Sequence, residues 1–392
     1  METLVTIGYI AICVLFFSLA IAIHEFGHFI VALKLGLRVE RFSIGFGPAI
    51  FKWKWRGVEY RISWIPLGGY VMIPDVDPEG TKKLEGGEGS RRLHDERKRK
   101  AIPAWKEIAV AVAGPGMNVV LALVLAVILS LLPSDRFGEL SCEVSGTMKG
   151  SQAEKAGIKA GDTILSVGGK KVSTWSEMQV EVQIAGFKET EFVVRDKSGT
   201  ERTVVMSPLQ NEVTGVFMIG AVSLKKENGL THWLPARNPL KQIAWDAGSI
   251  FRVLKGLVTP QEAKNTAKAL GGPQMIVEGI YRSVRHDFWD GVGFMRFLNV
   301  NLAVINLLPI PVLDGGLILF SLFALIFRRR VPEKVVSALS TAFMVLLLGA
   351  MSILIFRDAQ RSWRIHTYKP DAVEMSAGET STETNGTHDA SN

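Results

Sequence analysis

A cluster of residue types that bind metals lies near the N-terminus of this chain. His24, Glu25 and His28 form the pattern HExxH inside a stretch that is otherwise apolar from Leu4 to Leu33. On a helix, residues four apart share a face, so both imidazoles can bind one Zn²⁺ while the glutamate between them reaches an adjacent water. An ionisable residue in a membrane segment costs about 2–3 kcal/mol or more, so the cluster needs a partner such as a metal ion. The simpler alternative is a helix end at which these side chains only reach the membrane interface.

A zinc ion held by two histidines needs a third protein ligand, and Asp314 is the best candidate. It follows Pro309 and Pro311 and precedes Gly315 and Gly316, between two apolar runs. The prolines stop a helix and the glycines allow a turn, which leaves the carboxylate at membrane depth without a neighbouring cation. We therefore expect both histidines and Asp314 to be ligands. The alternative role, which ligation does not exclude, is the N-cap of a helix that starts near Gly315.

The chain has only two cysteines, and neither belongs to the histidine cluster. Cys13 lies in the first apolar window and Cys142 beyond the second, so no disulfide is expected. A site of histidine and carboxylate ligands is favoured over a structural zinc finger, and it leaves a coordination position open.

Hydropathy predicts a polytopic membrane protein. The 392 residues are 47% hydrophobic, with a mean hydropathy of +0.21. Four uncharged windows approach the length that spans a bilayer: 4–23, 108–132, 297–313 and 335–356. The third is short and contains prolines and asparagines, so we expect a broken helix whose freed backbone groups line a cavity. The first lacks the basic region and cleavage pattern of a signal peptide, so we expect it to be retained.

The distribution of cations predicts the topology. Arginines and lysines cluster in the loops after the first and third windows, as in cytoplasmic loops. The clusters comprise Arg91, Arg92, Arg97, Lys98, Arg99 and Lys100, and then Arg328, Arg329, Arg330 and Lys334. Both termini are therefore expected to be extracytoplasmic, although cations after the last window argue weakly the other way. Anionic lipid headgroups balance the net charge of +7, and no nucleic acid is expected as a partner.

A small β-rich domain is predicted over residues 139–224. Residues 152–162 are typical of a short helix and tight turn, and a helix is expected from Thr174 to Ile184. Strands are expected at 163–167, 192–195 and 203–206. The run AGIKAGDTIL, from Ala156 to Leu165, resembles the signature of bacterial protease PDZ domains. This resemblance implies a groove for an extended peptide or a C-terminus; a purely steric cover is the alternative.

Motifs along the whole chain carry a family resemblance. HExxH, together with NxxPxPxLDGG from Asn306 to Gly316, resembles the site-2 protease family of intramembrane zinc metalloproteases. Residues 42–47 and 66–71 look like that family's membrane-reentrant β loop. Residues 113–118 match its second-span motif, and 270–273 its GP-containing segment. The PDZ-like insertion is similar to the bacterial branch of the regulator of sigma-E protease type. Leu317 and Ala324 depart from the family pattern, where histidine and an acid respectively are common.

The resemblance implies a fold. We expect an α-helical polytopic membrane protein of about four transmembrane helices, the third broken, with a membrane-reentrant β hairpin and one inserted extracytoplasmic PDZ domain. Its location would be the inner or plasma membrane. The expected parts are a first protease core region (1–135), the PDZ domain (139–224), an amphipathic membrane-associated region (236–296), a second core region (297–358) and a disordered tail (372–392).

The resemblance also implies an activity, zinc-dependent cleavage of the transmembrane segments of single-span proteins. Anti-sigma factors and remnant signal peptides are the substrate types of this branch. Glu25 would be the catalytic base and, after taking a proton, the acid. The expected substrate-binding residues are Asn306, Gly45, Phe46, Gly47, Gly68, Gly69 and Tyr70. The alternatives are a catalytically silent PDZ adaptor and a metal transporter, although a transporter would show repeat symmetry that this chain lacks.

Overall fold

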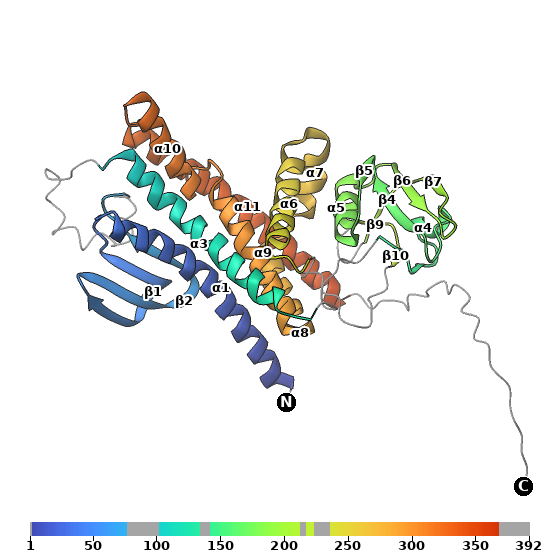
Figure 1. The fold of residues 1–392 in the computed structure, drawn as a ribbon, viewed down its shortest axis with the longest axis horizontal. Helices are drawn as coiled ribbons and strands as arrows, with labels where there is room; N and C mark the ends of the chain where they lie inside the picture. The colour runs from blue at the N-terminus through green and yellow to red at the C-terminus, as the bar shows by residue number, and fades with distance from the viewer. Residues whose placement is uncertain (1, 77–101, 134–141, 212–216, 223–235, 368–392) are drawn as a thin grey trace, which may run out of the picture. The chain divides into compact units, whose positions relative to one another are not determined.

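The computed structural model describes residues 2–76, 102–133, 142–211, 217–222 and 236–367. They fall into two compact units, the first made of Met1–Phe137, Trp233–Arg252 and Gly271–Asp358 and the second of Gly138–His232, Val253–Leu270 and Ala359–Asn392 (Figure 1). The basic cluster expected at 91–100 and the tail expected at 372–392 lie outside the described residues, as do the first residues of the expected PDZ domain.

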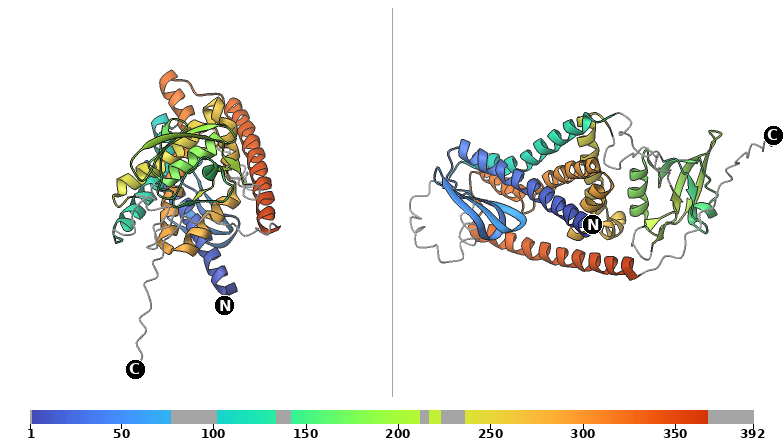
Figure 2. Two further views of the ribbon diagram at one scale, coloured as in Figure 1. Left: turned by 90° about the vertical axis from the view of Figure 1, so that its right-hand side faces the viewer. Right: turned by 90° about the horizontal axis from the view of Figure 1, so that it is seen from below.

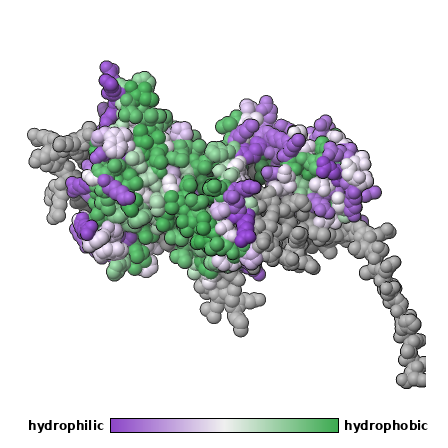
Figure 3. Space-filling view, viewed as in Figure 1, coloured by the Kyte–Doolittle hydropathy of each residue, from purple (hydrophilic) through white to green (hydrophobic). Residues whose placement is uncertain are grey.

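Helices dominate the first unit. Its elements are α1 (Glu2–Lys34), β1 (Arg41–Trp55), β2 (Val58–Met72), α3 (Ala104–Ser130), α8 (Pro273–His286), α9 (Phe288–Asn306), α10 (Asp314–Phe327) and most of α11 (Glu333–Thr367); α6 (Pro239–Val258) runs into the second unit. Segments Ala11–Lys34, Ala104–Ser130 and Glu333–Arg361 are long and apolar enough to cross a membrane. Hydrophobic side chains cover much of the helical surface on the face of this unit that Figure 3 shows. The apolar helices indicate a membrane protein.

The third expected span is broken, as predicted, but its helices lie elsewhere. The window 297–313 covers the end of α9 and the break, and the apolar helix α10 begins only at Asp314. Because α10 has 14 residues, it is shorter than the three candidate spans. The prediction was about four transmembrane helices with the third one broken. Among the described residues, three helices are long and apolar enough to cross a membrane, and α10 is a shorter apolar helix.

The long helix α11 forms one side of the first unit (Figure 2). None of its apolar window is buried against the rest of the chain. Side chains such as Leu346 and Ile353 are more than half exposed. In a membrane protein this surface contacts lipid, because water would make its exposure costly.

Strands β1 and β2 form a long bent antiparallel hairpin. Residues 41–44 pair on both sides, with 59–62 and with 69–72, so residues 69–72 form an edge of the sheet. The rings of Phe29, Phe42 and Tyr60 contact one another and pack the hairpin against α1. This packing brings the edge residues of β2 beside the helix that carries HExxH.

The second unit is built around the four-stranded sheet β5-β4-β6-β7. Its elements are β3 (Gly146–Thr147), α4 (Gln152–Lys155), β4 (Thr163–Val167), β5 (Lys170–Lys171), α5 (Trp175–Ala185), β6 (Thr190–Arg195), β7 (Glu201–Met206), β8 (Leu209–Gln210), β9 (Phe217–Met218), β10 (Ala221–Val222) and α7 (Pro260–Ala269). The predicted strands and helix are all present, and the Thr174 side chain caps α5 by accepting from the Glu177 N–H at 3.2 Å. Cys13 and Cys142 form no disulfide, in agreement with the prediction.

Candidate metal centre

Two histidines and one carboxylate converge between α1 and α10. Nε2 of His24 lies 3.2 Å from Oδ2 of Asp314, and Nε2 of His28 lies 3.4 Å from Oδ1 of the same residue. The two Nε2 atoms are 3.1 Å apart. The predicted ligands, far apart in the sequence, are thus brought together as one group that could hold a metal ion.

The spacing of these atoms fits zinc. Ligand atoms at 2.0–2.1 Å from a tetrahedral ion stand about 3.3 Å from one another. The two Nε2 atoms are 3.1 Å apart, and each lies 3.2–3.4 Å from a different oxygen of the Asp314 carboxylate, so each of these pairs is close to that value. One ligand atom from each of the three residues lies within 4.8 Å of the others. The His28 ring donates from Nδ1 to the Val110 carbonyl at 2.7 Å, so a neutral ring has its lone pair on Nε2. Two nitrogens that face each other this closely need a proton or a cation between them.

Helix α3 contacts both imidazoles at Nδ1, on the side opposite to Asp314. Besides the Val110 carbonyl on His28, the side-chain amide of Asn118 lies 3.1 Å from Nδ1 of His24. Asn118 is fully buried. Contacts of this kind fix the tautomer and direction of metal-binding histidines, so α3 leaves both Nε2 atoms directed toward Asp314.

Gly114 lets α3 approach the histidines. A Cβ atom at this position would lie 2.3 Å from Nε2 of His28 and 2.8 Å from Cε1 of His24. Any side chain here would occupy the space in which the imidazoles meet. The close helix packing that supports the centre therefore requires glycine.

Glu25 lies beside the edge of the hairpin. The backbone N–H of Val71 donates to its carboxylate. A Cβ on Gly69 would lie 3.1 Å from the Glu25 Cγ and 2.9 Å from the Ser43 carbonyl oxygen. Val71 of β2 therefore positions the Glu25 carboxylate, and Gly69 lies two residues earlier on the same open edge of the sheet.

A cavity of about 270 Å³ connects these groups. His24, Glu25 and Asp314 line it together with Asn118 and Asn306. Of the expected substrate-binding residues, Asn306 thus shares the cavity with the catalytic candidates. The hairpin residues do not line it: Phe46 and Tyr70 instead stack on each other, with ring centroids 6.2 Å apart.

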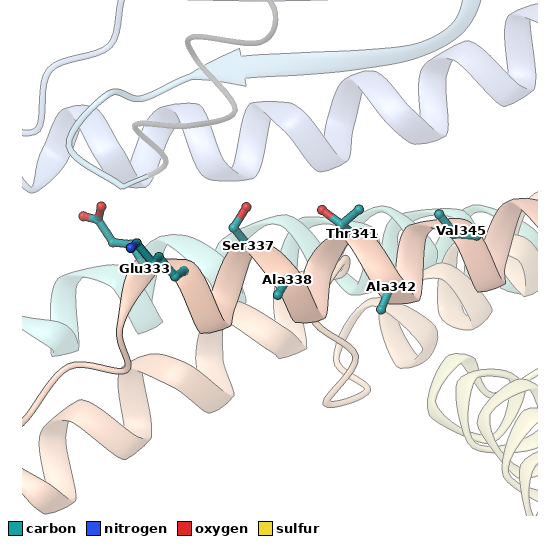
Figure 4. Close-up of a pocket in the computed structure, with 7 residues that line it drawn as sticks. Glu333, Ser337, Ala338, Thr341, Ala342 and Val345 are labelled. Atoms are coloured by element: carbon teal, nitrogen blue, oxygen red, sulfur yellow. The ribbon is translucent and has the colours of Figure 1, made fainter.

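A second cavity, of about 860 Å³, lies along α11 and contains no predicted site residue. Figure 4 shows Ser337 and Thr341 projecting from one side of the helix. The larger cavity is the more open of the two, whereas the smaller one is lined by His24, Glu25 and Asp314. We therefore place the chemistry in the smaller cavity.

Asp314 begins α10 but does not cap it. The helix starts at Asp314 itself, the N-cap position is Leu313, and no side chain accepts a hydrogen bond there. The alternative of Asp314 as the N-cap is therefore wrong. Its carboxylate is directed at the histidines instead.

Some supporting residues were not identified from the sequence. The contact of Val110 uses a backbone carbonyl, which no residue type reveals. Asn118 and Gly114 were noted only as parts of a motif, without a role. Leu317 and Ala324, which depart from the family pattern, both lie on α10 after the ligand candidate.

Comparisons with known proteins agree with this geometry. The model of peptidase family M50 matches residues 12–350. A protein of Campylobacter jejuni that is named as a zinc metalloprotease is 31% identical over 356 residues, which cover 89% of this chain and 92% of the relative. A similarly named protein of Clostridium perfringens is also 31% identical, over 89% of this chain and 98% of its own length. The metalloprotease MmpA of Caulobacter vibrioides is 29% identical over 379 residues, which cover 88% of this chain and 93% of the relative.

The family match covers both HExxH and Asp314, and the relatives align with nearly their full lengths. A zinc enzyme needs a donor set of the kind found between α1 and α10. The chain belongs to peptidase family M50, the site-2 protease family, and is a zinc-dependent metalloendopeptidase.

Proposed function

We propose that this protein cleaves the transmembrane segments of single-span membrane proteins, with His24, His28 and Asp314 as the zinc ligands and Glu25 as the catalytic base. The observation that carries the proposal is the convergence of the three ligand candidates at 3.1–3.4 Å, two of them within the candidate span Ala11–Lys34 and the third at the start of the shorter apolar helix α10. The position of these ligands on the apolar helices α1 and α10 supports cleavage within the bilayer. Anti-sigma factors and remnant signal peptides are the substrate types that the family resemblance favours.

Glu25 moves the proton in this scheme. A zinc ion held by His24, His28 and Asp314 would polarise the scissile carbonyl and would lower the pKa of the attacking water toward about 7. The Glu25 carboxylate accepts a proton from that water and then donates it to the nitrogen of the leaving amine. The Val71 N–H, which donates to the same carboxylate, holds it beside the cavity throughout.

The edge of β2 supplies a pairing surface for an unwound substrate. The Met72 carbonyl accepts from Glu40 and so points into the sheet. Because backbone groups alternate along a strand, Gly69 and Val71 point outward. The Val71 N–H is used by Glu25, which leaves the backbone of Gly69 for a substrate strand. The other hairpin glycines shape this edge, and Asn306 contacts the substrate main chain with its amide.

The second unit acts as a PDZ domain in this proposal. Its sheet, its helix α5 and its signature run support that assignment, and a peptide or C-terminus would bind along the sheet edge. Both termini and this domain are extracytoplasmic, with the cations after α10 on the cytoplasmic side of the inner or plasma membrane. Residues 236–296 associate with the membrane surface through their amphipathic helices.

The test compares the wild-type protein with Glu25→Gln. Purified full-length protein in detergent receives a generic single-span reporter, and the zinc content of both samples is matched. Wild type should cleave the reporter, and Glu25→Gln should bind zinc but lose at least about 100-fold in rate. Equal cleavage by both would overturn the mechanism.

Two other outcomes favour the alternatives. A zinc-loaded wild type that binds peptides but cleaves no reporter would favour the silent PDZ adaptor. Zinc uptake into proteoliposomes would favour transport, whereas one equivalent of zinc retained through dialysis contradicts it.

A further inference from the structure

A buried carboxylate joins α3 to α10 away from the candidate metal centre. Oε2 of Glu107 accepts from the Ser321 hydroxyl at 2.6 Å. Its Oε1 accepts from Nη2 of Arg330 at 2.9 Å, and the same arginine nitrogen donates to the Ile102 carbonyl at 2.7 Å. Glu107 is 6% exposed and Ser321 2% exposed. A buried carboxylate is costly without partners, and the Ser321 hydroxyl and the Arg330 guanidinium both compensate Glu107.

Glu107 and Ser321 lie on the same faces of α3 and α10 as the residues of the candidate metal centre. Ser321 follows Asp314 by seven residues, which is nearly two full turns, so both project from the same face of α10 about 10 Å apart. Glu107 precedes Gly114 by seven residues on α3, and Gly114 is the residue packed against both imidazoles. Helices α3 and α10 therefore meet at two places. The Ser321–Glu107 hydrogen bond lies at one, and the ligand cluster around Asp314 lies at the other.

Helix α10 has few polar side chains that could fix its orientation. Its sequence is DGGLILFSLFALIF, so Ser321 is its only polar side chain apart from Asp314. It follows a broken segment rather than continuing α9. Apolar contacts are not directional, so they resist rotation or sliding of a helix less than a short hydrogen bond does.

We propose that Glu107, acting through Ser321, is a positioning residue that sets the rotation and height of α10 against α3 and thereby holds Asp314 at the histidines. This inference rests on the proposed role of Asp314 as a zinc ligand. Arg330 neutralises the carboxylate and ties down the chain after α10, but the hydroxyl is the contact that orients the helix.

The test measures zinc release from the full-length zinc-loaded protein to a chelating dye. Ser321→Ala and Glu107→Ala should each release zinc about tenfold faster than wild type. The double variant should be no faster than the single ones, because both remove the same contact. Ser321→Thr keeps the hydroxyl and should restore slow release. Arg330→Ala should stay within about twofold of wild type.

Ser352→Ala is the matched control. Its hydroxyl also lies on an apolar helix, but it donates only to the Leu348 carbonyl of its own helix, and it should leave zinc release unchanged. The visible spectrum of the Co²⁺-loaded protein reports coordination geometry and should change in Ser321→Ala but not in Ser352→Ala. A purely structural role would lower the melting temperature and leave both readouts unchanged in the folded protein.

Asp314→Asn separates failure of this inference from failure of the proposed ligand set. If Asp314→Asn releases zinc rapidly while Ser321→Ala and Glu107→Ala behave as wild type, Asp314 is a ligand and the positioning role is wrong. If Asp314→Asn itself retains zinc as wild type does, the ligand assignment is wrong, and the positioning role is overturned with it.

Discussion

The amide of Asn118 on α3 lies 3.1 Å from Nδ1 of His24 on α1, across 94 positions of sequence. When Nε2 of that ring binds a metal, Nδ1 carries the proton, and the amide must present its oxygen to it. A half-turn of the amide achieves this without moving either helix. Asn118 therefore supports the predicted ligand from the side opposite the ion.

Asn118→Ala should weaken zinc binding by about 10- to 100-fold, because His24 loses the partner that holds its ring. Asn118→Asp keeps an oxygen acceptor and should bind zinc far more tightly than the alanine variant. Competition with a zinc indicator measures both affinities. Unchanged affinity in Asn118→Ala would show that the contact has no orienting role.

Gly114→Ala should disrupt the centre by direct overlap. The added Cβ would lie 2.3 Å from Nε2 of His28, so α3 or the imidazole must shift. We expect a loss of bound zinc and of cleavage of at least about tenfold. Gly116→Ala, two residues along the same helix, has nothing within 4 Å of its new Cβ and is the matched control. Similar zinc content in the two variants would contradict the packing described.

Gly69→Ala should reduce cleavage while zinc content stays at the wild-type level. Its Cβ would meet the Glu25 Cγ at 3.1 Å and the Ser43 oxygen at 2.9 Å, and none of its three nearest atoms belongs to a ligand candidate. A shift of the β2 edge away from the Glu25 carboxylate by a fraction of an ångström should lower kcat/KM by about 10- to 100-fold. Gly349→Ala, which adds a Cβ in open space on α11, serves as control. Normal turnover by Gly69→Ala would count against substrate pairing at this edge.

Asp246→Ala should destabilise the first unit strongly. Arg296 on α9 donates to Asp246 at 2.7 and 3.0 Å and to Gln242 at 2.6 Å, and all three side chains are fully buried. Removing one partner of a buried ion pair costs about 3–5 kcal/mol, because the other charge loses its compensation. Denaturant unfolding measures the loss.

The control for that experiment is Glu278→Ala. Glu278 pairs with Arg282 on α8 in the same unit, with side chains 41% and 69% exposed. An exposed pair of this kind contributes about 0–1 kcal/mol. An equal loss in the free energy of unfolding in the two variants would mean that burial adds nothing to the stabilisation by the Arg296–Asp246 pair.

Removal of zinc should abolish cleavage and lower the melting temperature. A ligand that binds only the folded state stabilises it by mass action, so the apoprotein should melt earlier. Zinc should restore both properties and Mg²⁺ neither, because histidine nitrogens suit zinc and magnesium prefers an oxygen shell. A melting temperature independent of zinc would argue that no ion bridges α1 and α10.

The sequence by itself determined the elements whose signals are local. The i, i+4 spacing of His24 and His28, the break around Pro309 and the cap at Thr174 each act within a few residues, so they could be predicted without a fold. The break and a helix start near Gly315 were both predicted correctly, but the uncharged window 297–313 ended before the apolar helix α10, because Asp314 at its start is charged.

Only the tertiary structure decided which residues support that cluster. Asn118 contacts His24 across 94 positions, and Ser321 contacts Glu107 across 214. The Val110 carbonyl contacts His28 across 82 positions, and a backbone atom carries no residue-type signal at all. Such contacts depend on how α1, α3 and α10 pack, which the free energy of the whole chain determines and no local pattern encodes.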